Sequence, residues 1–125
     1  MQHFIPIAFG GALGALARYA ITSGAHGSWG VPWPWGTLLI NAGGSLVIGV
    51  IFTLLERGAI HPEWRSILVV GFLGAFTTFS TYSLESVTLW LEGQALQAIG
   101  YALGSVVLCL AAAATGILLT RSLLT

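Results

Sequence analysis

Hydroxyl side chains that could contact an ion are concentrated in one short stretch of the chain. Five of the seven residues from Thr77 to Ser83 are serine or threonine, and Gly71 and Gly74 precede them. Because serine, threonine and glycine are poor helix formers, we predict a helix break near residues 74–81. The alternative is an intact helix whose hydroxyls bond its own carbonyls.

Two further sets of polar residues recur every four positions. Each step of four advances only about 40° around a helix, so each set forms one stripe. The first stripe comprises Thr37, Asn41, Ser45, Gly49 and Thr53. The second comprises Tyr101, Ser105 and Cys109, with Gly100 and Gly104 beside it as a seam of small residues. Helix packing explains either stripe alone. Together with the hydroxyl cluster they favour an oligomer with a permeation path.

A charge and two aromatic rings complete the candidate residues. Arg18 follows Gly10 and Gly14 at spacings of four, so we expect it to face protein together with these small residues. The alternative is a side chain that reaches the nearer membrane interface. Phe79 and Tyr82 lie inside the hydroxyl cluster. The positive edge of an aromatic ring attracts an anion weakly, which suits permeation, although plain packing is the commoner role of such rings.

The composition defines the class of protein that must position these residues. Of the 125 residues, 56% are hydrophobic and only 6% are charged, and the formal net charge is zero. So few charges cannot solvate a globular domain, which carries about 25% charged residues. A soluble enzyme and a nucleic-acid binder are therefore excluded. The chain has no aspartate for a Ser–His–Asp set and no metal-ligand spacing, so we expect no enzyme.

The length accommodates four membrane spans. A span needs about 20 residues, so four spans leave room only for short loops. We therefore predict one all-α domain over residues 1–125. Its four transmembrane helices are expected at about 4–23, 35–55, 63–92 and 95–119, and the third is expected to be broken in mid-membrane.

Three motifs resemble those of the CrcB/Fluc family of fluoride channels. Residues 71–85, GFLGAFTTFSTYSLE, resemble the family's signature in the third helix. Residues 35–45 resemble its second-helix motif, and residues 10–19 resemble its first. The resemblance implies a channel in the bacterial inner membrane that exports fluoride down its gradient. It also implies an antiparallel homodimer of dual topology, with no nucleic-acid partner.

The resemblance also implies roles for particular residues. A structural sodium ion at the dimer centre would bind the backbone carbonyls of Gly74 and Thr77. The fluoride pathway would use Asn41, Phe79, Tyr82, Ser80, Thr81, Thr37, Tyr101, Ser105, Glu85 and Arg18. Two positions depart from the family pattern, because Tyr82 stands where phenylalanine is usual and Cys109 where serine or threonine is expected.

Two other functions are compatible with a chain of this size. A small proton-coupled exporter with four helices needs a carboxylate deep in its first span, where this chain has Arg18 instead. A membrane subunit without transport activity would explain the small residues but would leave Asn41 and the hydroxyl cluster without a purpose.

Overall fold

The computed structural model describes the backbone of residues 2–29 and 34–125 and the side chains of residues 2–24 and 34–125. All regular structure in these ranges is helical, as the sequence predicts. The elements are α1 (Phe4–Trp29), α2 (Trp35–Glu56), η1 (Arg65–Leu73), α3 (Gly74–Phe76), α4 (Phe79–Leu91) and α5 (Ala95–Leu123). α1 and α5 continue past their expected ends at 23 and 119. Hydropathy locates the membrane-spanning part of a helix, and the helical backbone extends beyond that part.

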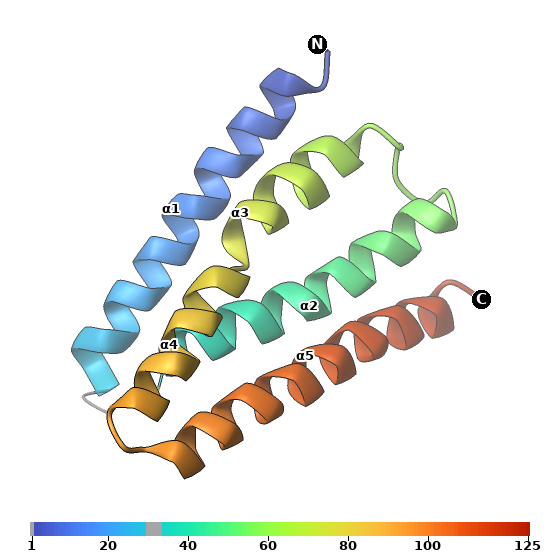
Figure 1. Ribbon diagram of the computed structural model, residues 1–125. Coiled ribbons are helices and arrows are strands. Elements are labelled where there is room, and N and C mark those ends of the chain that lie inside the picture. The colour runs from blue at the N-terminus through green and yellow to red at the C-terminus, as the bar shows by residue number, and fades with distance from the viewer. Residues whose placement is uncertain (1, 30–33) are drawn as a thin grey trace.

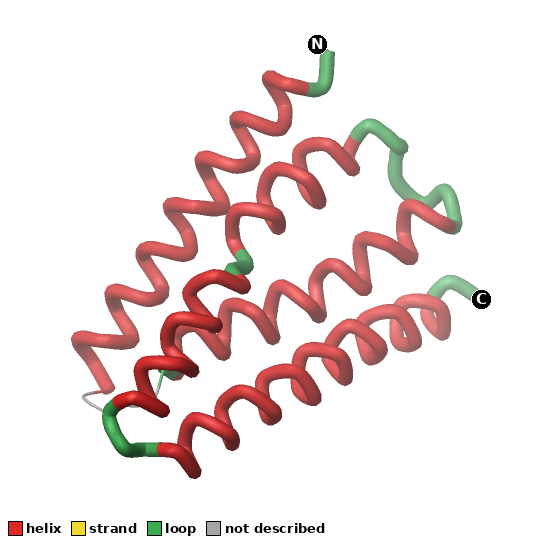
Figure 2. The backbone as a smooth tube through the Cα atoms, viewed as in Figure 1, coloured by secondary structure: helices red, strands yellow, loops and turns green. Residues whose placement is uncertain are grey.

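The helices are arranged as two adjacent pairs (Figures 1 and 2). α2 packs along α5, and α1 packs along η1 and α3. α4 turns toward the start of α5. Gly58 and Gly93 follow α2 and α4 with φ angles of +70° and +81°, which only glycine adopts readily. Both termini and the connection between α2 and η1 lie at one end of the bundle.

Glycines set the closest approaches between these helices. A Cβ on Gly10 would overlap the carbonyl oxygen of Ile67, and one on Gly14 would overlap that of Phe72. Gly49 of α2 and Gly116 of α5 have the same role in the other pair, where a Cβ would overlap the partner helix's backbone. Small residues let membrane helices pack at backbone distance, so these seams fix which helices pair.

The predicted seam at Gly100 and Gly104 has no such contact. Among the described residues, nothing lies within 4 Å of a Cβ built at either glycine. This seam is therefore not used for packing between helices within the described part of the chain. α5 presents this face outward because its other side is already occupied by α2 and α4.

The apolar side chains lie mostly on the outside of the bundle. The buried hydrophobic residues of the described chain are Ile40, Leu73, Leu89, Ala98 and Tyr101. By contrast, exposed leucine, isoleucine, valine and aromatic side chains occur on every long helix. Four described segments are long and apolar enough to cross a membrane: Phe4–Gly24, Trp35–Glu56, Arg65–Leu91 and Ala95–Leu123. Hydrocarbon, rather than water, is the solvent that suits this outer surface.

Candidate functional site

The third span contains two residues outside the helical conformation. Thr77 and Thr78 have extended backbone angles (φ −84°, ψ 155° and φ −149°, ψ 117°), between α3 and α4. The Thr77 hydroxyl donates to the Leu73 carbonyl at 2.9 Å. The Thr78 hydroxyl accepts from the backbone N–H of Thr81 at 3.2 Å and so caps α4. The hydroxyl cluster therefore terminates one helix and starts the next.

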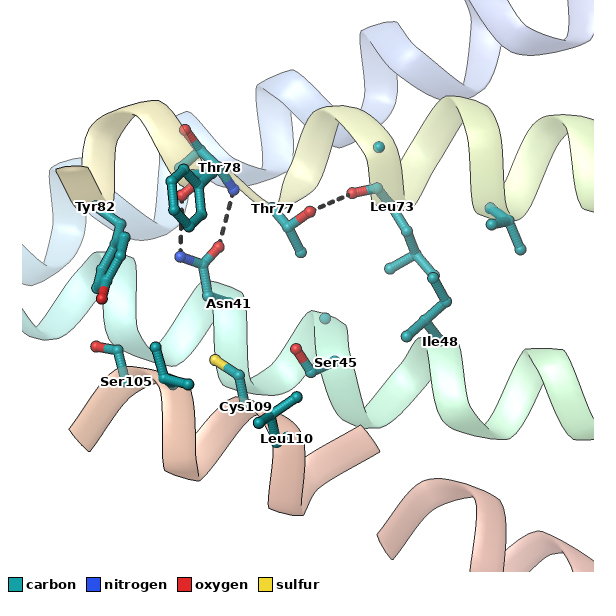
Figure 3. A pocket seen from close by; sticks show the side chains of 15 residues that line it. Asn41, Ser45, Ile48, Leu73, Thr77, Thr78, Tyr82, Ser105, Cys109 and Leu110 are labelled. Atoms are coloured by element: carbon teal, nitrogen blue, oxygen red, sulfur yellow. Dashed lines mark hydrogen bonds between the residues drawn. The ribbon is translucent and has the colours of Figure 1, made fainter. Parts of the chain in front are cut away.

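The Asn41 side chain binds the backbone of this extended segment (Figure 3). Its Nδ2 donates to the Thr78 carbonyl at 3.0 Å, and its Oδ1 accepts from the Thr78 N–H at 2.8 Å. One amide thus satisfies both backbone groups that Thr78 has withdrawn from the helix. An unpaired backbone group at this depth would be costly, so α2 and the extended segment depend on each other.

Arg18 binds the backbone of α3, just before the extended segment. Its Nε donates to the Ala75 carbonyl at 3.0 Å. The side chain therefore faces protein, as the glycine spacing predicts. The hydrogen bonds found around the break use the carbonyls of Leu73, Ala75 and Thr78. Among the described residues, none is found to the carbonyls of Gly74 and Thr77.

A cavity of about 420 Å³ lies between α2, α5 and the interrupted span. It brings together six of the residues singled out from the sequence, which are Asn41, Gly74, Thr77, Phe79, Tyr82 and Ser105. Its other polar or sulfur-bearing wall residues are Ser45, Thr78 and Cys109. The remaining wall is glycine and aliphatic side chains, so a small polar guest would meet few but defined partners.

The Ser105 hydroxyl is an unpaired polar group in the cavity wall. The residue is only 6% exposed. Its Oγ is buried and has no hydrogen-bond partner within the described part of the chain. A buried hydroxyl without a partner costs free energy unless something else in the cavity binds it. Ser105 is therefore a donor available to a guest of the cavity.

Aromatic rings form a row from the cavity to α5. The ring centroids of Phe79 and Tyr82 are 5.3 Å apart at an interplanar angle of 56°, and those of Tyr82 and Tyr101 are 5.5 Å apart at 49°. The Tyr82 hydroxyl donates to the Ala102 carbonyl at 2.7 Å, which holds its ring against α5. Phe79 is 77% exposed and lies at the open edge of the cavity.

Several predicted site residues lie outside the cavity wall. Tyr101 is buried behind Tyr82, donates to the Glu85 carboxylate at 3.0 Å and interacts with the Thr37 hydroxyl. The Ser80 and Thr81 hydroxyls lie 3.3 and 3.1 Å from that of Thr78. These residues support the break and the aromatic row instead of lining the cavity.

Sequence reasoning left other wall residues out of the candidate site, and three of them, Thr78, Ser45 and Gly44, lie at or near the extended segment. Thr78 belongs to the hydroxyl cluster, and Ser45 belongs to the stripe on α2, so both carried a signal. Gly44 gave no signal in the sequence, because its role is to leave space for a neighbouring side chain. A Cβ there would overlap the Thr77 methyl group, so only glycine leaves room for the extended segment.

Four helices that are long and apolar enough to cross a membrane define a multi-pass membrane protein. The family model "CrcB-like protein, Camphor Resistance (CrcB)" matches residues 5–117. The chain therefore belongs to the CrcB family, which confirms the resemblance seen in its motifs.

Three relatives that match over most of this chain carry the same name, "Fluoride-specific ion channel FluC". The relative from Hahella chejuensis is 48% identical over 99% of this chain and 98% of its own length. The relative from Methylococcus capsulatus is 49% identical over 94% of this chain, which spans about half (52%) of that longer protein. The relative from Paracoccus denitrificans is 45% identical over 98% of both chains.

Proposed function

We propose that this chain is a fluoride-selective channel that lets cytoplasmic fluoride leave down its electrochemical gradient. The observation that carries the proposal is the cavity beside the interrupted span, where Ser105, Phe79 and Tyr82 converge. The name of the CrcB relatives, fluoride-specific ion channel, supports the same function. The proposed location is the bacterial inner membrane.

The cavity residues would replace part of the water around fluoride. Among the described residues, the Ser105 O–H has no hydrogen-bond partner, so it could donate to the ion. The ring edges of Phe79 and Tyr82 carry partial positive charge and attract an anion weakly. Weak, successive contacts suit conduction, because an ion must leave each site as well as enter it. Asn41 would act by holding Thr78, which precedes Phe79, and Arg18 by holding α3 on the other side of the break, since each binds a backbone carbonyl there.

The proposed assembly is an antiparallel homodimer in which the third span is a broken helix in mid-membrane. One chain buries few of its apolar side chains, which supports a second copy. Arg57 and Arg65 flank the connection between α2 and η1, and Arg121 lies in the last turn of α5, so all three are at the end of the bundle that carries the termini. Arg18 lies along α1, where it bonds Ala75 beside the break. This charge bias toward termini inside is mild, so it permits insertion in both orientations.

The unused carbonyls of Gly74 and Thr77 suit a sodium ion. Carbonyl oxygen is the donor that hard cations prefer, and neither carbonyl has a hydrogen bond among the described residues. We propose that these two residues would hold a structural sodium ion between two copies. The ion would supply fixed positive charge to the centre of the assembly.

Passive efflux from liposomes tests the channel directly. Purified protein is reconstituted into vesicles loaded with potassium fluoride, valinomycin is added to prevent a build-up of potential, and an electrode records released fluoride. We expect fast fluoride release and no chloride release from matched vesicles. No fluoride release from well-incorporated protein would refute the channel, and release only with a proton gradient would point to a coupled exporter.

A further inference from the structure

The chain's single cysteine lies in the wall of the cavity. Cys109 is partly exposed and lines the cavity together with Ser105, one helical turn earlier on α5. In Figure 3 the Cys109 side chain extends from α5 toward Asn41, and Ser105 lies next to it along α5, beneath Tyr82. The thiol therefore borders the space through which the proposed function routes fluoride.

The unpaired Ser105 hydroxyl independently indicates that this part of the cavity takes a polar guest. It is more than nine-tenths buried and has no partner among the described residues. Ser105 and Cys109 are four residues apart on α5, so a guest that binds Ser105 lies about 6 Å from the level of Cys109 along the helix axis. A group attached to the Cys109 sulfur would therefore compete with that guest for the same space.

We propose that Cys109 is a thiol-modification site that controls conduction, and that its ligands are small, uncharged sulfur electrophiles of the methanethiosulfonate class. This inference rests on the proposed channel function. In the reaction, the Cys109 sulfur attacks the sulfenyl sulfur of methyl methanethiosulfonate. A Cys109–S–S–CH₃ bond forms, the S–SO₂ bond breaks, methanesulfinate leaves with the electron pair, and the thiol proton passes to water. No other oxidant or reductant is needed.

The added methylthio group alters the cavity in two ways. It fills space opposite Asn41 and Ser45, and it replaces a weak S–H donor with an apolar methyl group. Both changes disfavour a small, strongly hydrated anion. A serine at this position would keep a polar wall and would not react, so the sensitivity is a property of the thiol.

The test compares the wild-type chain with Cys109→Ser in the liposome assay. Each protein is treated with methyl methanethiosulfonate in its folded state, and the adduct is quantified by intact mass before reconstitution. Each efflux rate is divided by the rate of the same protein left untreated. We expect wild-type fluoride flux to fall about tenfold, equivalent to a barrier higher by about 1.4 kcal/mol, and to recover after reduction with dithiothreitol. Cys109→Ser should not respond.

A relocated cysteine provides the matched control. Ala111→Cys in the Cys109→Ser background places a thiol roughly 200° around α5, at an exposed position outside the cavity wall. We expect this variant to form the adduct and keep its flux. Cys109→Ala replaces Cys109→Ser if the latter does not fold.

The outcomes separate the thiol site from the channel. Complete modification of Cys109 with unchanged flux would overturn the inference. So would a thiol that reacts only after unfolding in detergent. If untreated protein releases no fluoride, the proposed function fails, whereas the adduct yield still reports whether the cavity admits the reagent.

Discussion

Removing the Asn41 amide is the sharpest test of how the extended segment is held. In Asn41→Ala, the Thr78 N–H and carbonyl lose the hydrogen bonds that they make to the amide at 2.8 and 3.0 Å. No other side chain is seen to bond these two groups in the described structure. A backbone N–H and a carbonyl that lose these partners cost free energy unless another group binds them.

The size of the effect follows from the two lost bonds. Hydrogen bonds between membrane helices contribute about 0.6 kcal/mol on average and up to about 1.7 kcal/mol, so the pair is worth roughly 1–3 kcal/mol. If conduction requires the segment in this conformation, the same free energy lowers fluoride flux by roughly 5- to 150-fold. We expect Asn41→Ala to be less stable and to conduct slowly while remaining folded.

Two assays read the two consequences. Thermal unfolding in detergent measures the stability, and liposome efflux measures the flux. Thr115→Ala is the matched control, because its exposed hydroxyl bonds only its own helix, at the Ala111 carbonyl. Asn41→Ala with normal stability and normal flux would refute the role of the amide at the break. Lower stability with normal flux would show that conduction does not depend on this conformation.

Three further variants test other parts of the fold. Gly14→Ala should lower the free energy of unfolding by about 1–3 kcal/mol because its Cβ overlaps η1, whereas Gly100→Ala should have little effect because nothing lies near it. Phe79→Ile keeps apolar bulk but loses the ring edge, so fluoride efflux should slow severalfold; unchanged efflux would refute the aromatic contact. Arg121→Gln should change stability by less than about 1 kcal/mol, because its 3.3 Å ion pair with Glu56 is exposed. A larger loss in thermal unfolding would contradict that estimate.

The aromatic row illustrates what a sequence cannot supply. Phe79 and Tyr82 are close in sequence, and their proximity could be expected from helical spacing. Tyr101 joins them only because α4 folds back onto α5. The hydrogen bond from the Tyr82 hydroxyl to the Ala102 carbonyl likewise depends on how α4 and α5 are placed, so no local sequence pattern predicts it.

The sequence by itself determined the class of protein, the four spans and the family. Each of these depends on local quantities: hydropathy over about 20 residues, helical periodicity, and motifs within single helices. The poor helix propensity of the hydroxyl cluster likewise drew attention to Thr77 and Thr78, which the structure holds in extended conformation.

Only the tertiary structure decided what each polar residue does. Asn41 and Arg18 bind backbone groups 37 and 57 positions away, and Ser105 has no hydrogen-bond partner among the described residues. Such pairings depend on which helices approach closely, and glycines such as Gly14 and Gly49 fix that through backbone contact. A stripe of polar residues predicts that one face of a helix contacts protein or a polar guest instead of lipid. The surrounding helices determine whether each residue of the stripe supports the fold or faces the cavity.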